Sequence, residues 1–327
     1  MSAADFDDAV IVLSGGVGGA KLVQGFLAAM DPAKLIVVAN TADDFEHLGL
    51  SISPDLDTLM YTLAGVHDEQ QGWGRRDETW SFMEALEGLG GDTWFRLGDR
   101  DLATHVERTR RRQRGETLSQ IAADLCRQLG VKSRLLPMSD DSVRTRFKTA
   151  EGWLDFQDYF VRQRCAPRIE EIRFEGAQQA ALQPTLSAAL HHRRLRAVVI
   201  APSNPFISIE PILSVGGVRA AITGCAAPVI AVSPIIAGRA VKGPTEKMMR
   251  EFGLPPGVDA VLHRYDGLID AMLVDIVDAN TVMIKSPQIF SAPLLMRTSE
   301  DKILLARAVL DVVDRFAGEA RSTRAKS

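Results

Sequence analysis

Short apolar runs on either side of one helical stretch open the chain. Residues 9–13 (AVIVL) and 35–39 (LIVVA) are continuous apolar runs, which are typical of strands buried on both faces. Between them lies a glycine-rich turn at residues 14–19, and apolar side chains then recur at helical spacing through residues 20–30. A strand, a glycine turn, a helix and a second strand in this order predict the first unit of a parallel, right-handed α/β sheet.

The same pattern returns in the second half of the chain. Residues 196–200 (RAVVI) run into Ala-Pro-Ser-Asn-Pro, and residues 228–232 (PVIAV) run into Ser-Pro-Ile-Ile-Ala-Gly. Each apolar run therefore ends in polar residues and turn formers. Since open α/β sheets bind ligands at the carboxyl ends of their strands, we expect a ligand site at these ends. Residues 300–317 are expected to form a terminal amphipathic helix.

The middle of the chain has a different texture. Helical patterns cover residues 54–65, 78–88, 101–114 and 118–129, the last with Thr117 or Ser119 as its cap. Alternating patterns at 143–148 and 153–161 predict a β-hairpin. The predicted fold class is α/β: a Rossmann-like, mostly parallel sheet flanked by helices. Residues 1–70 and 196–327 would form this nucleotide-binding core, and residues 71–195 a helical and hairpin insertion over the ligand edge.

Composition excludes several classes of protein. The 327 residues are 46% hydrophobic and 24% charged, with a formal net charge of -4, so the chain is neither disordered nor fibrous and has no basic field for nucleic acid. No apolar stretch reaches the roughly 20 residues that span a bilayer. Acidic residues before the first apolar run are the wrong charge for a secretory signal. Three widely spaced cysteines predict reduced thiols and a cytoplasmic protein.

The turn Ser14-Gly15-Gly16-Val17-Gly18-Gly19-Ala20-Lys21 is the first candidate site. Glycines let backbone N–H groups approach a phosphate, and the N-terminus of the following helix favours negative charge. The turn is not a Walker A loop, which would need glycine at Ala20 and Ser or Thr at Leu22, and it is not GxGxxG. A tight turn without a ligand is the alternative, and phosphate or nucleotide binding is the favoured interpretation.

Acidic residues follow the second apolar run. Asp43 and Asp44 in Asn40-Thr41-Ala42-Asp43-Asp44 could hold Mg²⁺, or could cap the next segment. Asp55 and Asp57 fall in the first turn of a helix that begins at Pro54, where carboxylates favour the helix dipole. One of these two acids is explained by the dipole, and together with Asp43 and Asp44 they suggest a shared cation or polar-ligand site.

Further candidates lie in three segments. Trp94, Phe95 and Arg96 could form a platform for a planar ring, although a strand end before a capped helix is the alternative; His105 alone is more typical of a packed or surface histidine. Asn204, Ser208, Ser233 and Lys242 could contact a base, a sugar or a phosphate. The basic run 110–114 is interpreted as a solvated helix face, with substrate steering as the second interpretation. Hydrolase triads and zinc motifs have no support.

Together these segments resemble a known family. LSGGVGGAKL, ANTADD, SPDLDTLMYTLAG, GWGRRDETW, WFRLGDRDLATH, LLPMSDDSVRT, APSNPFISIEPIL and AVSPIIAGRAVKGP are similar to the motifs of 2-phospho-L-lactate transferase, the CofD or FbiA family of coenzyme F420 biosynthesis. The resemblance covers roughly residues 9–275. It departs from the family pattern at Val215-Gly216-Gly217, where proline is expected in the middle, and at Ser51, where a larger polar residue is usual.

The resemblance implies a transfer reaction. A guanosine diphosphate diester of lactate, or its enolpyruvyl or phosphoglyceryl counterpart, would donate its phospho-organic-acid group to the ribityl hydroxyl of the deazaflavin Fo. GMP would leave, and F420-0 or its dehydro form would be the product. The resemblance favours a homodimer. The acidic residues predict Mg²⁺ as cofactor, and composition predicts no nucleic-acid or membrane partner.

The resemblance also assigns the candidate residues. Asp43 and Asp57 would be catalytic, and Asp43 and Asp44 would bind the metal. Fo would lie against Asp55, Asp57, Trp94, Phe95 and Arg96. The donor nucleotide would lie against Gly15, Gly16, Gly18, Gly19, Lys21, Asn40, Asn204, Ser208, Ser233 and Lys242. Positioning and charge neutralisation dominate phosphoryl transfer, which fits these residue types.

Two other interpretations stay open at this point. A related regulatory family of nucleotide-sugar-binding proteins shares the glycine turn and the sheet, but it is expected to lack WFRLGDRDLATH, which is present here. A nicotinamide-dependent dehydrogenase would also begin with this α/β unit. It would need GxGxxG, and the glycine spacing of this turn argues against it.

Overall fold

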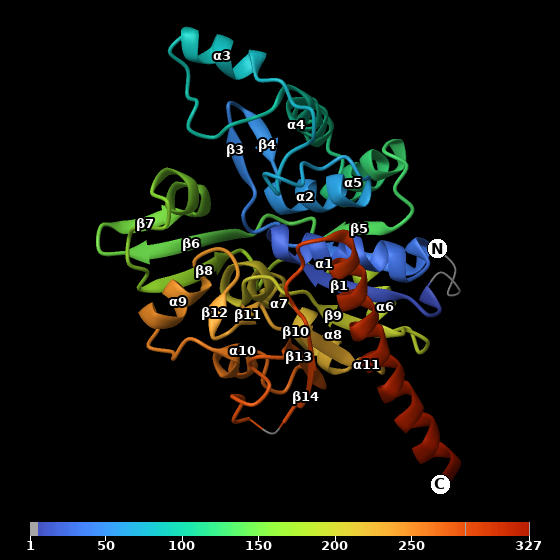
Figure 1. Ribbon diagram of the computed structural model, residues 1–327. Coiled ribbons are helices and arrows are strands. Elements are labelled where there is room, and N and C mark those ends of the chain that lie inside the picture. Colours follow the sequence, from blue (N-terminus) through green and yellow to red (C-terminus); the bar gives the residue numbers. More distant parts are fainter. Residues whose placement is uncertain (1–5, 285, 327) are drawn as a thin grey trace.

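A parallel sheet of seven strands forms the centre of the computed structural model, which describes residues 6–284 and 286–326 (Figure 1). Its order is β14-β13-β10-β9-β1-β2-β5. The strands are β1 (Val10–Ser14), β2 (Leu35–Ala39), β5 (Arg134–Pro137), β9 (Ala197–Ile200), β10 (Val229–Val232), β13 (Ala271–Asp275) and β14 (Gln288–Ala292). Every neighbouring pair is parallel, with Leu13 of β1 opposite Val38 of β2 and Ile200 of β9. The predicted α/β class is confirmed.

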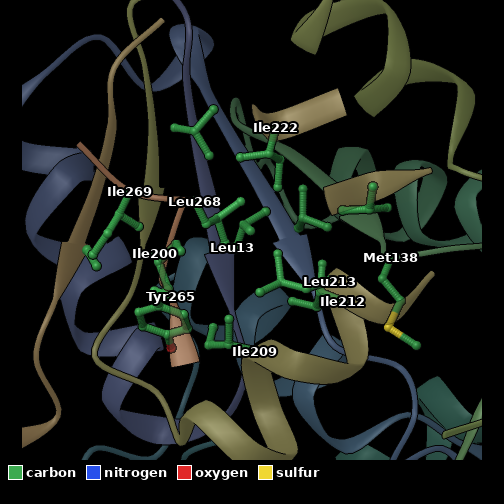
Figure 2. Close-up of a cluster of buried hydrophobic side chains, with 14 of the residues drawn as sticks. Leu13, Met138, Ile200, Ile209, Ile212, Leu213, Ile222, Tyr265, Leu268 and Ile269 are labelled. Atoms are coloured by element: carbon green, nitrogen blue, oxygen red, sulfur yellow. The ribbon is translucent and has the colours of Figure 1, made fainter. Parts of the chain in front are cut away.

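Helices cover both faces of this sheet. Side chains alternate along β1, so Val10 and Val12 join one core, and Ile11 and Leu13 join the other. Figure 2 shows part of the second core, where Leu13 and Ile200 lie close to Ile209 and Ile212. The first face is covered by α1 (Gly16–Ala29), α2 (Pro54–Leu63), α5 (Leu118–Gln128) and α11 (Ser299–Lys326). The second is covered by α6 (Pro184–Leu190), α7 (Glu210–Ser214), α8 (Val218–Thr223), α9 (Thr245–Glu251) and α10 (Val258–Arg264).

Smaller units extend beyond the sheet at its carboxyl edge. The hairpin β3 (Phe45–His47) and β4 (Leu50–Ile52) packs with α3 (Ser81–Gly88) and α4 (Asp99–Arg112) around a small core of Ile52, Met83 and Leu97. Figure 1 shows α3 well away from the main sheet. An antiparallel sheet of β6 (Arg144–Thr149), β7 (Gly152–Asp155) and β8 (Glu171–Glu175) lies to one side, and a short hairpin is formed by β11 (Ile235–Ile236) and β12 (Arg239–Ala240).

Two expectations about the middle of the chain need correction. β5 lies within residues 71–195, the range expected to be an insertion, yet it is the edge strand of the main sheet and pairs with β2. The strand predicted over 153–161 ends at Asp155, and a short helical segment follows at Asp158–Arg162. The reason is packing: Phe156 and Tyr159, three residues apart, both contact Phe147, with ring centroids 5.8 and 4.4 Å away.

Two further points concern α4 and α5. Thr117 is the cap of α5, since its side chain accepts from the Gln120 backbone N–H. In the basic run, Arg110 pairs with Glu107, and Arg111 pairs with Asp124 of α5 at 2.7 Å. These ion pairs account for two of the run's arginines without a ligand. No helix among residues 6–284 and 286–326 has the length and apolarity to cross a membrane.

Candidate functional site

A cavity of ≈ 680 Å³ opens beside β1 and β9, where the order in which the chain adds strands to the sheet reverses. From β1 the chain moves to β2 and β5 on one side, and then to β9, β10, β13 and β14 on the other. The loops after β1 and β9 therefore diverge at the carboxyl edge, and this is the place where α/β sheets bind ligands. The cavity is lined by these loops, by α2 and α4, and by the segments around Trp94, Phe156, Lys242 and Leu294.

The glycine turn begins α1 and forms one wall of the cavity. Gly16 has a φ of +66°, and its N–H donates to Asp55 Oδ1 at 2.7 Å. Ser203, after β9, donates to the Gly15 carbonyl at 2.7 Å. A Cβ on Gly18 would lie 2.6 Å from the Pro202 carbonyl oxygen, so glycine is required there by the approach of the β9 loop. Close backbone contacts within the protein are therefore one reason for the glycines of this turn, in addition to ligand binding.

Two lysines give one side of the cavity a positive charge. Lys21 Nζ donates to the Met296 carbonyl at 3.0 Å, and both Lys21 and Lys242 line the cavity. Burial lowers the pKa of Lys21, and repulsion from Lys242 and Lys302 lowers it further. An anion bound between Lys21 and Lys242 would relieve this repulsion, so the glycine turn and its lysines fit a phosphate or diphosphate.

Asp43, which is buried, and Asp55, which is half-buried, both line the cavity. Burial, and then repulsion from Asp55, hold the pKa of Asp43 well above its usual range. Burial raises the pKa of Asp55 to about 6, although its oxygens accept from the Gly16 N–H and from Asn40 Nδ2. Thr145 donates to Asp43 Oδ1 over a long 3.3 Å. Two acids that repel each other at one cavity favour sharing a proton, or a bound cation.

Asp44 is buried and does not line the cavity. Its Oδ2 accepts from Ser53 Oγ at 2.8 Å, and Oδ1 is buried without a hydrogen-bond partner in the described part of the chain. Burial raises the pKa of Asp44 to about 7. Carboxylate oxygens are the ligands that Mg²⁺ prefers, and buried acids with an unpartnered oxygen are what such an ion would satisfy. Asp43 with Asp44 or Asp55 therefore fits a magnesium ion.

Asp57 has a different environment, because it is paired with a cation of the protein. Its Oδ1 accepts from Arg108 Nη2, while Oδ2 is buried and has no hydrogen-bond partner among the described residues. Burial raises the pKa of Asp57, and Arg108 and His105 oppose this rise. Asp57, Tyr61, Asp101 and His105 all line the cavity. The sequence analysis missed Tyr61, Asp101 and Arg108, although the spacing 101–105–108 puts three polar side chains on one face of a helix.

Aromatic side chains form another wall of the cavity. Phe95 contacts Phe45 edge to face, with centroids 4.8 Å apart, and Trp94 carries the Arg162 guanidinium over its ring at 4.2 Å. Arg96 lies over the Trp80 ring at 4.1 Å. Phe156 and Phe160, which the sequence analysis missed, line the same cavity and stack on each other at 5.2 Å. This wall suits a planar, aromatic ligand.

Most residues proposed from the sequence come together in this one cavity. Its lining includes Gly15, Gly16, Gly18, Lys21, Asp43, Asp55, Asp57, Trp94, Phe95, Arg96, Asn204, Ser208, Ser233 and Lys242. Gly19, Asn40 and Asp44 are buried behind this lining. Asn40 supports the wall, because it donates to Asp55 and accepts from the Ala42 N–H.

Comparison with known proteins gives the chain a family. The family described as "2-phospho-L-lactate transferase CofD" matches residues 10–293. A phosphoenolpyruvate transferase from Kitasatospora aureofaciens is 40% identical, over 93% of this chain and 98% of the relative. A 2-phospho-L-lactate transferase from Methanopyrus kandleri is 38% identical, over 94% and 98%. A crystal structure of a UPF0052 family member from Bacillus halodurans, 15% identical, matches with a TM-score of 0.60 over 93% of this chain and 99% of that one, which shows similarity of fold.

Proposed function

Because this chain belongs to the 2-phospho-L-lactate transferase CofD family, we propose that it transfers a phospho-organic-acid group from a guanosine diphosphate diester to the ribityl hydroxyl of the deazaflavin Fo. The family expected from the sequence motifs is confirmed. The organic acid is lactate, enolpyruvate or phosphoglycerate, and GMP is the leaving group.

One observation carries this proposal: a single cavity brings together a cationic glycine turn, buried acids and an aromatic wall. A transferase of this kind must hold a diphosphate, a metal ion and a large planar ring at the same time. Phosphoryl transfer needs little covalent chemistry from the protein, so positioning and charge neutralisation are the main requirements. The three parts of the cavity supply these requirements from different segments of the chain.

The donor is assigned to the side formed by the glycine turn. Lys21 and Lys242 neutralise the diphosphate, and the N-terminus of α1 faces it. Ser208 is close to this turn, since a Cβ on Gly15 would lie 2.8 Å from Ser208 Cβ. Asn204 and Ser233 line the same side, and their side chains also fix the loops after β9 and β10 by accepting from Phe206 N–H at 2.9 Å and Ile235 N–H at 3.1 Å. These polar groups face the guanosine.

A magnesium ion is assigned to Asp43, with either Asp44 or Asp55 as the second ligand. Such an ion would neutralise the negative charge that develops on the transferred phosphoryl group. Asp43 and Asp55 reach the cavity directly, whereas Asp44 offers an unpartnered Oδ1 from behind it. Asp43 and Asp44 are buried and Asp55 is half-buried, so the ion would also relieve the cost of ionising them.

The acceptor is assigned to the aromatic side. Trp94, Phe95 and Arg96 contact the deazaflavin ring, and the ribityl chain extends toward Asp55 and Asp57. The free Oδ2 of Asp57 accepts the hydrogen of the terminal hydroxyl. The hydroxyl oxygen bonds to the phosphorus that bears the organic acid, the bridging P–O bond to GMP breaks, and the hydroxyl proton passes to Asp57.

Transfer is tested with purified protein, Fo and Mg²⁺, and with each of the three donors in turn. Anion-exchange separation with mass detection should reveal a more acidic deazaflavin, together with an equal amount of GMP. Titration of Fo fluorescence, with and without GDP and Mg²⁺, reports whether both ligands share one cavity. Nucleotide binding with no response to Fo and no product from any donor would refute the proposal and favour the nucleotide-binding regulatory alternative.

A further inference from the structure

A buried arginine lies behind the wall of the cavity. Arg108, on α4, is 1% exposed and is among the largest fully buried side chains. Removing a guanidinium from water costs several kcal/mol, and replacing a buried ion pair by packed apolar residues is often neutral or stabilising. Stability alone therefore gives little reason for an arginine here, and its contacts suggest another one.

Arg108 holds Asp57 by one oxygen only. Its Nη2 donates to Asp57 Oδ1, and its Nη1 donates to the Ser51 carbonyl at 3.2 Å. An arginine usually engages both oxygens of a carboxylate with its planar fork. Here the second arm of the fork is used by the β4 backbone. Asp57 Oδ2 is thus left buried and without a hydrogen-bond partner in the described chain, on a residue that lines the cavity.

His105 lies against the other side of this carboxylate. Its Nδ1 lies 3.6 Å from Asp57 Oδ2 and 3.2 Å from Arg108 Nη1. Since an arginine N–H can only donate, Nδ1 is the acceptor, and the ring hydrogen is on Nε2, which lies 3.1 Å from Asp101 Oδ2. Tyr61 donates from its hydroxyl to Asp101 Oδ1 at 2.6 Å. The Arg108 N–H therefore orients the imidazole, which lies between the Asp57 and Asp101 carboxylates.

The same cluster resembles a metal site, but its charges argue against one. One ligand atom each from Asp57, Asp101 and His105 lie within 4.8 Å of one another. Arg108 contacts two of these three residues, and its fixed positive charge would repel a divalent cation. Asp101 is moreover engaged by Tyr61. Arg108 contacts Asp57 and His105, and Asp101 contacts His105 and Tyr61. A network that orients the Asp57 side chain explains all four contacts.

We propose that Arg108 and His105, backed by Asp101 and Tyr61, are positioning residues that present Asp57 Oδ2 to the acceptor hydroxyl. The inference rests on the proposed transferase function. Arg108 fixes Asp57 Oδ1, the His105 ring packs beside the carboxylate and limits its rotation, and the unpaired Oδ2 is left for the reacting group. The aromatic wall binds the deazaflavin ring independently. Disturbing the network should therefore slow the transfer step without weakening Fo binding.

The test compares Arg108→Lys with wild type and with Arg111→Lys, a matched control on the same helix. Lysine keeps the charge but cannot reach Ser51 and Asp57 together. We expect kcat to fall about 100-fold, the usual effect of misplacing a reacting group by about 1 Å. The KM for Fo and its affinity by fluorescence should stay at the wild-type value, and Arg111→Lys should keep normal kcat.

Tyr61→Phe tests the network without removing a charge. It deletes only the hydroxyl, which contacts Asp101 and Thr104, so the fold is retained even if Arg108→Lys fails to fold. A lower kcat at unchanged KM supports the proposal. Wild-type kcat in both folded variants, or a loss of Fo affinity that accounts for the whole defect, overturns it. A wild-type protein that is inactive with every donor refutes the proposed function itself, so the two failures are distinguishable.

Discussion

Replacing Asp44 with asparagine should stabilise the metal-free protein above pH 5. Burial raises the pKa of Asp44 to about 7 from its ordinary 3.8, so the folded protein binds this proton more tightly than the unfolded chain does. Wild-type stability therefore falls as pH rises from about 4 to 7 and then levels off, because unfolding releases the proton. Asparagine carries no charge and can still accept from Ser53.

The expected size follows from the same values. Between pH 5 and the Asp44 pKa of about 7 lie two pH units. At about 1.4 kcal/mol each, the stability advantage of Asp44→Asn over wild type should grow by about 3 kcal/mol between pH 5 and pH 8. Urea unfolding, followed by tryptophan fluorescence in a chelating buffer at both pH values, measures this difference. Replacing the exposed Glu151 by glutamine is the control, and it should show no such growth.

An advantage of Asp44→Asn that is equal at both pH values would refute the reasoning, because it would mean that Asp44 carries no buried charge.

A second measurement, with added Mg²⁺, identifies the metal ligands. An ion at 100 times its dissociation constant stabilises the folded state by about 2.7 kcal/mol. Loss of this stabilisation in Asp44→Asn assigns Asp44 as the second ligand. If Mg²⁺ still stabilises Asp44→Asn but no longer stabilises Asp55→Asn, Asp55 is the second ligand.

Three further predictions concern the rest of the cavity. Asp43→Asn should abolish transfer and leave the circular dichroism spectrum unchanged; normal turnover would remove Asp43 from the mechanism. Gly18→Val should lower the melting temperature, because its side chain would meet the Pro202 carbonyl, and a wild-type melting temperature would show that the turn can move away. Trp94→Leu should weaken Fo binding about tenfold by fluorescence titration, as expected for one lost stacking contact, while GDP affinity, the control, stays constant.

The fold was predicted correctly where the burial of a strand or helix leaves a recognisable pattern of apolar residues in the sequence. Residues 35–39 are apolar throughout because β2 is covered on both faces, and its predicted bounds match the structure. β5 was missed because it has only four residues, with an apolar pair before Pro137, and shows no period. The strand predicted over 153–161 is too long, since the structure ends it at Asp155. Strand alternation and helical spacing cannot be distinguished over so few aromatic residues.

The site was predictable as far as it depends on strand ends. Polar residues that follow parallel strands meet at one edge of the sheet, so separate motifs could be assigned to one cavity. Orientation was not predictable: Asp43 and Asp44 are adjacent, yet only Asp43 reaches the cavity. The partner of Asp57 was not predictable either, because Arg108 is 51 residues away and its pairing depends on how α4 packs against α2.

The cavity holds its carboxylates in two different electrostatic states. Asp57 has a cation built in, Arg108, and its negative charge is therefore balanced before any ligand enters. Among the described residues neither Asp43 nor Asp55 has such a partner, and burial raises the pKa of both. The first arrangement suits a group that must accept a hydrogen bond from a neutral hydroxyl. The second suits a group that completes its charge balance only with a metal ion, so a transferase with these acids should gain stability when Mg²⁺ binds, before the acceptor arrives.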